Sequence, residues 1–480
     1  MSPLTEQQVD AIAHRLAARM GGPPVSASAP SPATVAPAVG DGIHPDVDTC
    51  VAAATRAFRN LGECSLATRN AMIAAIRAIM RTEGDRLARL AHDETGLGRY
   101  ADKVIKNRLV TEKTPGTEDL RPLTATGDRG LTLMEWAPYG VIGAITPTTN
   151  PTSTIICNTI GMVAAGNAVV FNVHPSAVRC SMETVRLINR AIVAAGGPVD
   201  VVTAVGAPTV QSAQALMVHK GVRLLVVTGG AGVVKAAMTS GKRAICAGPG
   251  NPPVVVDATA DIAAAGRAIV DGASFDNNII CVDEKEVFVV ESVADELLRA
   301  MRSAGAYLAS GTDVRKLEST VFDETHGPRK PGHMAKECIG KNAAEIMRLA
   351  GIPVDGDPRL VVCDVPEDHP LVWTEQMMPV LPVVRVPDVN RAIDLAREAE
   401  HGFGHSAAMH SRDIVALSRM ARVMNTSIFV KNGPIYSGLG EGGEGHTSFT
   451  IASPTGEGLT GPLSFSRQRR CVMVDHFRIV

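Results

Sequence analysis

Aromatic residues are scarce in this 480-residue chain, at 3% of the sequence, whereas small aliphatic residues and glycine are abundant. A platform that stacks single-stranded nucleic acid needs several aromatic side chains. An excess of one charge is lacking as well, since 47 basic residues are balanced by 49 acidic ones. Such a balance produces no field that would attract nucleic acid or an anionic membrane. We therefore expect small-molecule or protein partners, and close packing of helices on sheets.

Paired cysteine motifs and long apolar runs are also missing. The nine cysteines are widely scattered without a CxxC pair, so the sequence predicts neither a disulfide framework nor a zinc ribbon. No window approaches the roughly 18 apolar residues of a membrane span. The N-terminal residues mix charges with apolar side chains and lack a signal-peptide core. These absences predict a cytoplasmic protein with reduced thiols and no membrane partner.

Residues 1–20 are predicted to form an amphipathic helix, followed by a flexible linker over residues 21–42. Thr5 and Gln8 fit a capping box, and one apolar stripe contains Val9, Ile12, Ala13, Leu16 and Met20. The linker is rich in Gly, Pro, Ser and Ala, which do not build a core. Because so short a helix is marginal alone, its stripe needs a partner. It either packs against its own chain or docks on another protein, and the long linker favours docking.

Between residues 137 and 257, short apolar runs alternate with helical patterns. The predicted helices in this region are 177–195 and 209–220, and the predicted strands are 141–146, 167–172, 199–204, 222–227, 243–247 and 254–257. Such βαβ units predict a mostly parallel, doubly wound sheet. A second alternation, from about residue 253 to 430, predicts another α/β domain. The β-rich segments 129–138 and 471–480 remain, and they could pair with each other or across subunits.

Several segments carry residue types that are suited to chemistry. Cys281 lies where the helical pattern 261–273 gives way to the strand 285–290, beside Asn277 and Asn278. Asn150 follows a strand in a proline-bounded turn, where its amide is a suitable oxyanion donor. A free cysteine is more often a buried apolar residue, and asparagine is common in turns. Neither residue identifies a site alone.

Two further patterns give weaker signals. The glycine-rich turn 228–237 opens a helix that could receive a phosphate, although it lacks the full GxGxxG spacing. The formal match at 438–443 has no helix after it and predicts a loop. His401, His405 and His410 would suit a metal, but Gly402 and Gly404 interrupt the helix that such spacing needs, and we expect no metal site.

Taken in order, these segments resemble the aldehyde dehydrogenase superfamily, and within it the CoA-acylating propionaldehyde and acetaldehyde dehydrogenases of bacterial microcompartments. The resemblance covers roughly residues 43–480, and the stretch 442–458 is specific to that branch. It rests on 145-ITPTTNP-151, 172-NVHPSA-177, 227-VTGGAG-232, 247-AGPGNPP-253, Cys281 and 374-TEQMMPVLPVV-384. The N-terminal helix and linker resemble the encapsulation peptides by which such enzymes dock on a protein shell.

The resemblance implies an α/β fold with two doubly wound domains and a small β-flap that forms homo-oligomers. A dinucleotide-binding domain would span 43–250 and include the flap at 123–138. A catalytic domain would span 251–434, and residues 435–480 would return as an oligomerisation strand. The resemblance also implies a location inside a bacterial microcompartment, with a shell protein bound through residues 1–20.

Carried over residue by residue, the resemblance implies that Cys281 is the nucleophile and Asn150 the oxyanion donor. Glu375 would bind the nicotinamide ribose of NAD, and the other dinucleotide contacts would be Thr146, Pro147, His174, Thr228, Gly229 and Gly248. His174 stands where hydrolytic relatives have a lysine. Ala177 stands where those relatives have a carboxylate for the ribose hydroxyl, so NADP is not excluded.

A second departure from hydrolytic relatives concerns the base that activates water. Ala247 occupies the position of their glutamate. Water, with a pKa of about 15.7, is a poor nucleophile without such a base, whereas a thiol of pKa about 8.5 is partly ionised near neutrality. The sequence therefore predicts reversible acyl transfer from Cys281 to CoA. A hydrolytic or semialdehyde dehydrogenase with another base, and an inactive shell-associated adaptor, are the alternatives.

Overall fold

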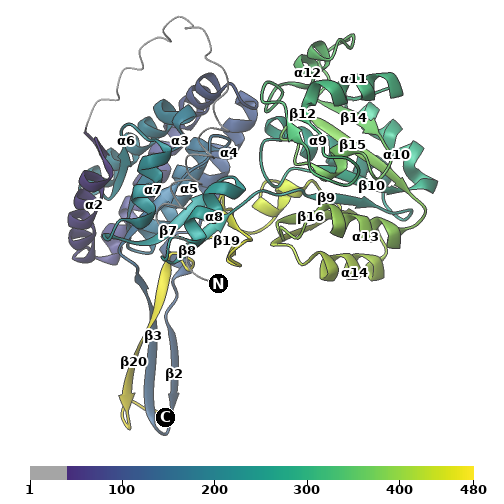
Figure 1. Cartoon of the computed structure of the whole chain (residues 1–480). Coiled ribbons are helices and arrows are strands. Elements are labelled where there is room, and N and C mark those ends of the chain that lie inside the picture. Colours follow the sequence, from purple (N-terminus) through teal and green to yellow (C-terminus); the bar gives the residue numbers. More distant parts are fainter. Residues whose placement is uncertain (1–39) are drawn as a thin grey trace, which may run out of the picture. The chain divides into compact units, whose positions relative to one another are not determined.

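Two all-parallel sheets carry the predicted βαβ alternation in the computed structural model, which describes residues 40–480 (Figure 1). The predicted helix 1–20 and most of the predicted linker lie outside the described residues. The described residues belong to one compact unit. The expected α/β class with two doubly wound sheets is confirmed, while the domain boundaries proposed from the sequence stay predictions.

The first sheet has the strand order β1-β6-β5-β4-β7-β8. Its strands are β1 (Ile43–His44), β4 (Val141–Ile145), β5 (Ala168–Asn172), β6 (Val202–Val205), β7 (Val222–Thr228) and β8 (Ala244–Ala247). The five strands expected between residues 141 and 247 are therefore confirmed, with ends shifted by up to three residues.

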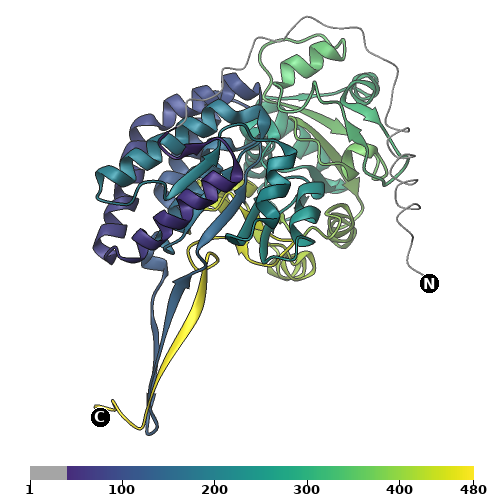
Figure 2. The same cartoon turned by 60° about the vertical axis from the view of Figure 1, so that its left-hand side comes forward.

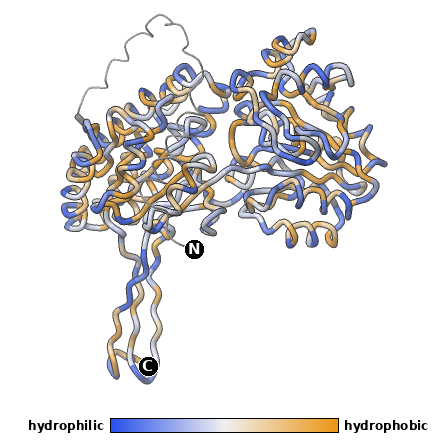
Figure 3. The backbone as a smooth tube through the Cα atoms, viewed as in Figure 1, coloured by the Kyte–Doolittle hydropathy of each residue, from blue (hydrophilic) through white to orange (hydrophobic). Residues whose placement is uncertain are grey.

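Both faces of this sheet are covered by helices, which explains why its strands are continuous apolar runs (Figure 3). Along β4, Val141 and Ile145 pack on one face, whereas Ile142 and Ala144 pack on the other, because successive side chains alternate. The first face is covered by α2 (Val47–Gly62), α7 (Val210–Val218) and α8 (Ala231–Met238). The second is covered by α3 (Leu66–Thr95), α5 (Pro151–Ala164) and α6 (Val178–Ala194).

The second sheet has the strand order β11-β14-β15-β10-β9-β16-β17. Its strands are β9 (Pro253–Val256), β10 (Glu286–Val290), β11 (Ala306–Leu308), β14 (Leu360–Asp364), β15 (Val380–Val386), β16 (Ser406–His410) and β17 (Ile428–Lys431). The strand predicted at 254–257 lies where the two predicted alternations overlap, and it pairs in this second sheet, between β10 and β16.

Helices also cover both faces of the second sheet. On one face lie α9 (Ile262–Ser274) and α10 (Glu291–Ser303). On the other lie α11 (Gly311–Val321), α12 (Ala343–Leu349), α13 (Val389–Ala399) and α14 (Ile414–Met424). The short hairpins are β12 (Phe322–Glu324) with β13 (His333–Met334), and β18 (Ile451–Ala452) with β19 (Gly458–Leu459).

A three-stranded antiparallel sheet forms the β-flap and projects from the helices and strands around it (Figure 2). It contains β2 (Leu123–Gly127), β3 (Gly130–Pro138) and β20 (Ser466–Val474). The suggestion that the two leftover β segments pair with each other is confirmed, since Gly130 opposes Val474 and Pro138 opposes Ser466. The C-terminal strand begins and ends earlier than predicted.

The remaining helix, α4 (Tyr100–Lys113), lies against α3, α5 and the 3-10 turn η3 (Phe275–Asn278) that precedes Cys281. The other short 3-10 turns are η1 (Thr117–Asp119), η2 (Pro175–Ala177), η4 (Pro370–Trp373) and η5 (Ile435–Leu439). Within residues 40–480, no helix combines the length and apolarity that crossing a bilayer requires.

Candidate active site

A cavity of about 710 Å³ lies at the carboxyl ends of β4, β5, β7 and β8. The strand β4 has β5 on one side and β7 on the other, so the direction of strand succession reverses there. Ligands of open parallel sheets bind outside the carboxyl ends of the strands at such a reversal. The topology therefore places a binding site where this cavity is found.

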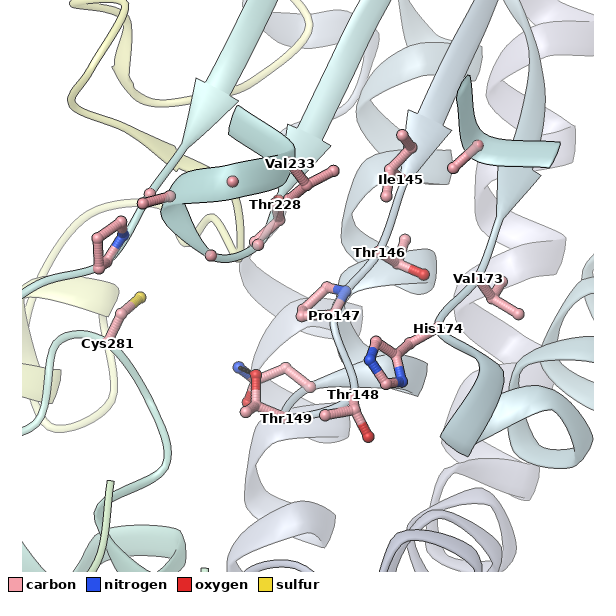
Figure 4. A pocket seen from close by; sticks show the side chains of 18 of the residues that line it. Ile145, Thr146, Pro147, Thr148, Thr149, Val173, His174, Thr228, Val233 and Cys281 are labelled. Carbon is pink, nitrogen blue, oxygen red and sulfur yellow. Dashed lines mark hydrogen bonds between the residues drawn. The ribbon is translucent and has the colours of Figure 1, made fainter. Parts of the chain in front are cut away.

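The structure brings all nine residues that the sequence singled out to the wall of this one cavity. They are Thr146, Pro147, Asn150, His174, Thr228, Gly229, Gly248, Cys281 and Glu375. Figure 4 shows Cys281 on a loop across the cavity from the turn Pro147–Thr149 that follows β4. These residues are far apart in sequence. They meet because some follow neighbouring strands of the first sheet, and others lie on loops that precede strands of the second sheet.

The loop before Cys281 has an uncommon backbone. Three consecutive residues, Asp276, Asn277 and Asn278, have φ angles of 44°, 55° and 63°. Such values are uncommon outside glycine, although Asp and Asn tolerate them best. The Asn278 amide donates to the carbonyls of Ala273 at 2.9 Å and Glu284 at 2.8 Å. These bonds fix the turn that presents the cysteine.

The surroundings of Cys281 keep its thiol protonated in the free protein. Burial, followed by the nearby Glu375 carboxylate, raises the pKa of Cys281 to about 12, although Lys285 acts in the opposite direction. The residue is only partly buried, and it lines the cavity. The cysteine is therefore placed to react, and its proton must leave when it does.

Replacing Glu375 with glutamine is expected to speed alkylation of Cys281 by iodoacetamide several-fold at pH 8–9. The carboxylate raises the cysteine pKa, so its removal lowers that pKa and increases the thiolate fraction, tenfold for each unit. The measurement is the alkylation rate of the Cys281 peptide by mass spectrometry, with the Cys64 peptide as internal control. An unchanged or slower rate would contradict this electrostatic assignment.

Asn150 lies between β4 and α5, with Pro151 as the first residue of the helix. Its side chain makes no capping hydrogen bond to that helix. Instead, Oδ1 accepts a hydrogen bond from Lys106 Nζ at 2.7 Å, and Nδ2 donates to Thr149 Oγ1 at 3.1 Å. The amide is thus held from the side of α4 while it lines the cavity.

The opposite part of the cavity has groups that fit a dinucleotide. The hydroxyls of Thr146 and Thr148 are buried without a hydrogen-bond partner and lie on the cavity wall. The helix α8 begins after Gly230, has no side-chain cap, and its first residues also line the cavity. Free N–H groups at a helix N-terminus, reached past glycines, suit a pyrophosphate. Glu375 Oε1, which accepts from Gly250 N at 3.4 Å, provides an acceptor for sugar hydroxyls.

The comparisons with known proteins agree with this geometry. A family model described as "Aldehyde dehydrogenase family" matches residues 22–453. The chain belongs to the aldehyde dehydrogenase family. The acetylating acetaldehyde dehydrogenase EutE of Salmonella typhimurium is 49% identical over 440 residues, which cover 92% of this chain and 94% of that protein.

Two solved structures are similar throughout. Propionaldehyde dehydrogenase of Rhodopseudomonas palustris, with bound CoA and an acylated cysteine, has a TM-score of 0.88 and 48% identity, covering 91% of this chain and 99% of that one. A propionaldehyde dehydrogenase from the fucose utilisation bacterial microcompartment of Clostridium phytofermentans has a TM-score of 0.89 and 44% identity, covering 92% and 100%. The resemblance deduced from the sequence is confirmed.

In this aldehyde dehydrogenase, His174 is engaged by its own backbone. Its Nδ1 accepts a hydrogen bond from Ser176 N at 3.1 Å, and burial lowers its pKa. A neutral ring at this position cannot replace the charge of a lysine. Ala177 next to it is fully buried. Among the described residues that line the cavity, none is a lysine or an arginine.

Ala247 ends β8 and is buried, and the next two residues line the cavity. Among the described residues of the cavity wall, Glu375 is the single carboxylate. None of the three histidines considered for a metal lines the cavity. His401 Nε2 contacts the carbonyl of Trp373 at 2.9 Å, His405 Nδ1 lies 3.0 Å from Ser406 Oγ, and His410 ends β16. A different exposed trio, Glu324, His326 and His333, has its ligand-type atoms within 4.8 Å of one another.

Lys106 is the residue at this site that the sequence reasoning missed. It lies on α4 with Lys103 and Asn107, and all three side chains are buried. The available signal was polar residues at positions i, i+3 and i+4 that share a face with the apolar Val110. A buried helix face with two lysines indicates partners in the interior.

Proposed function

We propose that the protein oxidises a short-chain aldehyde with NAD and transfers the acyl group to CoA. The observation that carries this proposal is the cavity itself. It combines a partly accessible Cys281, the amide of Asn150 and a single carboxylate, with alanine at 247. The relatives support the proposal, because EutE is an acetylating dehydrogenase and the Rhodopseudomonas palustris enzyme was solved with CoA and an acylated cysteine.

The residues divide the work as follows. The sulfur of Cys281 loses its proton and forms a bond to the aldehyde carbon, and the carbonyl oxygen becomes an oxyanion. Asn150 Nδ2 and the backbone N–H of Cys281 donate hydrogen bonds to that oxyanion. When bound, the dinucleotide accepts the hydride. Cys281 then carries a thioester. The CoA thiol loses its proton to water, its sulfur bonds to the acyl carbon, the bond from that carbon to Cys281 breaks, and the Cys281 sulfur takes up a proton. Since one thioester replaces another, the transfer is reversible.

The choice between NAD and NADP follows from the adenosine end of the cavity. Glu375 and the start of α8 serve both dinucleotides equally. With Ala177 at the position that carries a carboxylate in hydrolytic relatives, nothing there opposes a 2′-phosphate. We therefore propose NAD as the oxidant with NADP accepted, and initial rates with each dinucleotide measure the preference.

The direct test is to incubate the full chain with propionaldehyde or acetaldehyde and NAD, with and without CoA, and to identify the product. We expect NADH formation that depends on CoA and yields the acyl-CoA. NADH that forms equally fast without CoA, with free acid as the product, would instead establish a hydrolytic dehydrogenase that uses Glu375 or another base. Absence of NADH with both aldehydes would favour the inactive adaptor.

Introducing a carboxylate by Ala247→Glu is expected to increase the share of free acid among the products. The new group would stand at the end of β8, next to cavity residues, where it can deprotonate water. The ratio of free acid to acyl-CoA measures the effect, and Ala247→Gln is the matched control without a base. An unchanged ratio in the glutamate variant, with normal NADH formation, would contradict the role assigned to the missing base.

We further propose that the protein is housed in a bacterial microcompartment, with residues 1–20 bound to a shell protein. The amphipathic stripe and the linker predicted from the sequence support this, as does the microcompartment source of the Clostridium phytofermentans relative. Deleting residues 1–20 is expected to leave turnover within about twofold and to abolish co-purification with shells, because the sequence predicts a linker between this segment and the rest of the chain. A Leu16→Glu variant should behave like the deletion. Retention of either variant with shells would refute docking through this segment.

The β-flap is the proposed oligomerisation surface. The edge strand β20 exposes Val472, Met473 and Val474, and unpaired edge strands invite pairing with another chain. We propose a homo-oligomer that buries this edge. Light scattering of a chain with Val472→Lys and Val474→Lys, compared with the unaltered chain, tests it through the loss of the larger species.

A further inference from the structure

Lys106 lies behind the cavity, outside its wall, and touches one residue of the proposed chemistry directly. Its side chain is 2% exposed. The ammonium donates a 2.7 Å hydrogen bond to Asn150 Oδ1 and a second hydrogen bond to Asp276 Oδ2. A lysine buried to this degree is rare unless it is paired, so these two contacts define its role.

The contact with Asn150 decides which end of the amide faces the substrate. An amide side chain can rotate by 180° and exchange its oxygen and nitrogen, and only the nitrogen can stabilise an oxyanion. An ammonium group donates and cannot accept, so the amide oxygen must face Lys106. The amide nitrogen is then left with one hydrogen for Thr149 Oγ1, at 3.1 Å, and one for the cavity.

We propose that Lys106 is a positioning residue that fixes the Asn150 amide with its nitrogen toward the carbonyl oxygen of the aldehyde. This inference rests on the proposed function, because it assigns the oxyanion to Asn150. Without Lys106, the amide is free to turn its oxygen toward the cavity, where it would repel the developing negative charge. The loss would then appear in the chemical step.

The contact with Asp276 extends the same role to the nucleophile. Asp276 belongs to the left-handed turn that leads to Cys281, and its carboxylate also accepts from Arg99 N at 2.6 Å and Lys103 Nζ at 3.1 Å. Through one ammonium group, the oxyanion donor that follows β4 is linked to the turn that presents the sulfur. Asn150 follows a strand of the first sheet, and Cys281 precedes a strand of the second. Holding the two side chains in a fixed relative position is what an enzyme needs to speed a reaction by orienting its groups.

The charge state of Lys106 is consistent with this role. Burial and, secondarily, Lys103 lower its pKa to about 8, while Asp276 acts to raise it. Near neutral pH the group is therefore mostly protonated and remains a donor. The charged groups around this cluster also include Arg99, Asp102, Asp283 and Arg359.

The test compares Lys106→Met with Lys103→Met in full chains. Both variants remove a buried ammonium that contacts Asp276, one turn apart on α4, but only Lys106 contacts Asn150. We expect Lys106→Met to lower kcat for acyl-CoA formation about 10–100-fold, part of the 10²–10³-fold attributed to a whole oxyanion donor. Lys103→Met should stay within about fivefold, and the Kd for NAD should be unchanged in both.

A double-mutant cycle separates positioning from general damage. If Lys106 acts mainly through Asn150, adding Lys106→Met to Asn150→Ala should lower kcat further by no more than the roughly fivefold allowed for Lys103→Met, because only the link to Asp276 is left to lose. Lys106→Arg, which still donates, should recover activity relative to Lys106→Met. A full, additive loss in the Asn150→Ala background, or equal losses for the two methionine variants, would overturn the proposal. If the unaltered protein forms no acyl-CoA, the proposed function fails, whereas an active protein with an unimpaired Lys106→Met variant refutes only the role of Lys106.

Discussion

Replacing Cys281 with alanine is expected to abolish formation of acyl-CoA, with a loss of about 10³-fold or more in kcat. The thioester cannot form without the sulfur, and removal of a nucleophile typically leaves only what binding and oxyanion stabilisation provide. Among the nine cysteines, Cys281 is the one that lines the cavity. Steady-state NADH formation with propionaldehyde and CoA measures the loss.

Binding of the dinucleotide should survive this change. The groups that fit the dinucleotide lie on the turn after β4, at the start of α8 and at Glu375, and none depends on the sulfur. Titration of the variant with NADH, followed by fluorescence, should give a Kd within about twofold of the unaltered protein. Cys471→Ala, at an exposed position on β20, serves as the matched control and should be fully active. Substantial acyl-CoA formation by the alanine variant would refute Cys281 as the acyl carrier.

The sequence was sufficient to predict the strands of the first sheet because they are buried on both faces. A continuous apolar run such as 222–227, placed between two helical patterns, is typical of a strand that is covered by helices on both faces. The strand at 254–257 falls where the two predicted alternations overlap, and its apolar run looks like its predecessors. The run alone does not say which sheet it joins, and the structure pairs it with β10 and β16 in the second sheet. Which sheet a strand joins depends on the tertiary fold, and the residue pattern of the strand itself does not carry that information.

The candidate site could be collected from the sequence only through the family resemblance. Cys281, Asn150 and Glu375 are separated by more than ninety residues from one another, and no periodicity links them. What places them together is the tertiary fold: Asn150 follows β4, whereas Cys281 and Glu375 precede β10 and β15, which are neighbours in the second sheet. Lys106 was not predicted as a site residue, because the sequence around it does not indicate its partners. These are Asn150 and Asp276, which lie on loops far away in the sequence.

The Asp276 carboxylate neutralises two buried ammonium groups at once. Lys103 and Lys106 are 3% and 2% exposed, and Asp276 itself is fully buried. Its left-handed φ of 44° is tolerated by aspartate and asparagine but costs other residues more. Asparagine is therefore the substitution that removes the charge without adding backbone strain.

Asp276→Asn is expected to lower the free energy of unfolding by roughly 3 kcal/mol. Without the carboxylate, the two lysine ammonium groups stay buried without a counter-charge, in surroundings that solvate them poorly. The shift of the urea midpoint at an unchanged slope measures it. The matched control is Asp394→Asn, whose carboxylate pairs with Arg419 at 2.8 Å at the exposed surface and should hardly move the midpoint. A midpoint unchanged by Asp276→Asn would show that the two lysines do not need this counter-charge.

Adding Lys103→Met and Lys106→Met to Asp276→Asn should restore much of the lost stability. Replacing a whole buried ionic cluster with apolar groups of similar volume is often neutral, because the desolvation cost of the charges disappears with them. Activity should nevertheless stay low, because the triple variant has no donor to hold the Asn150 amide and no link to the turn before Cys281. Recovery of stability without recovery of kcat would show that the cluster serves the geometry of the reaction. Recovery of both would mean that its charges serve the fold alone.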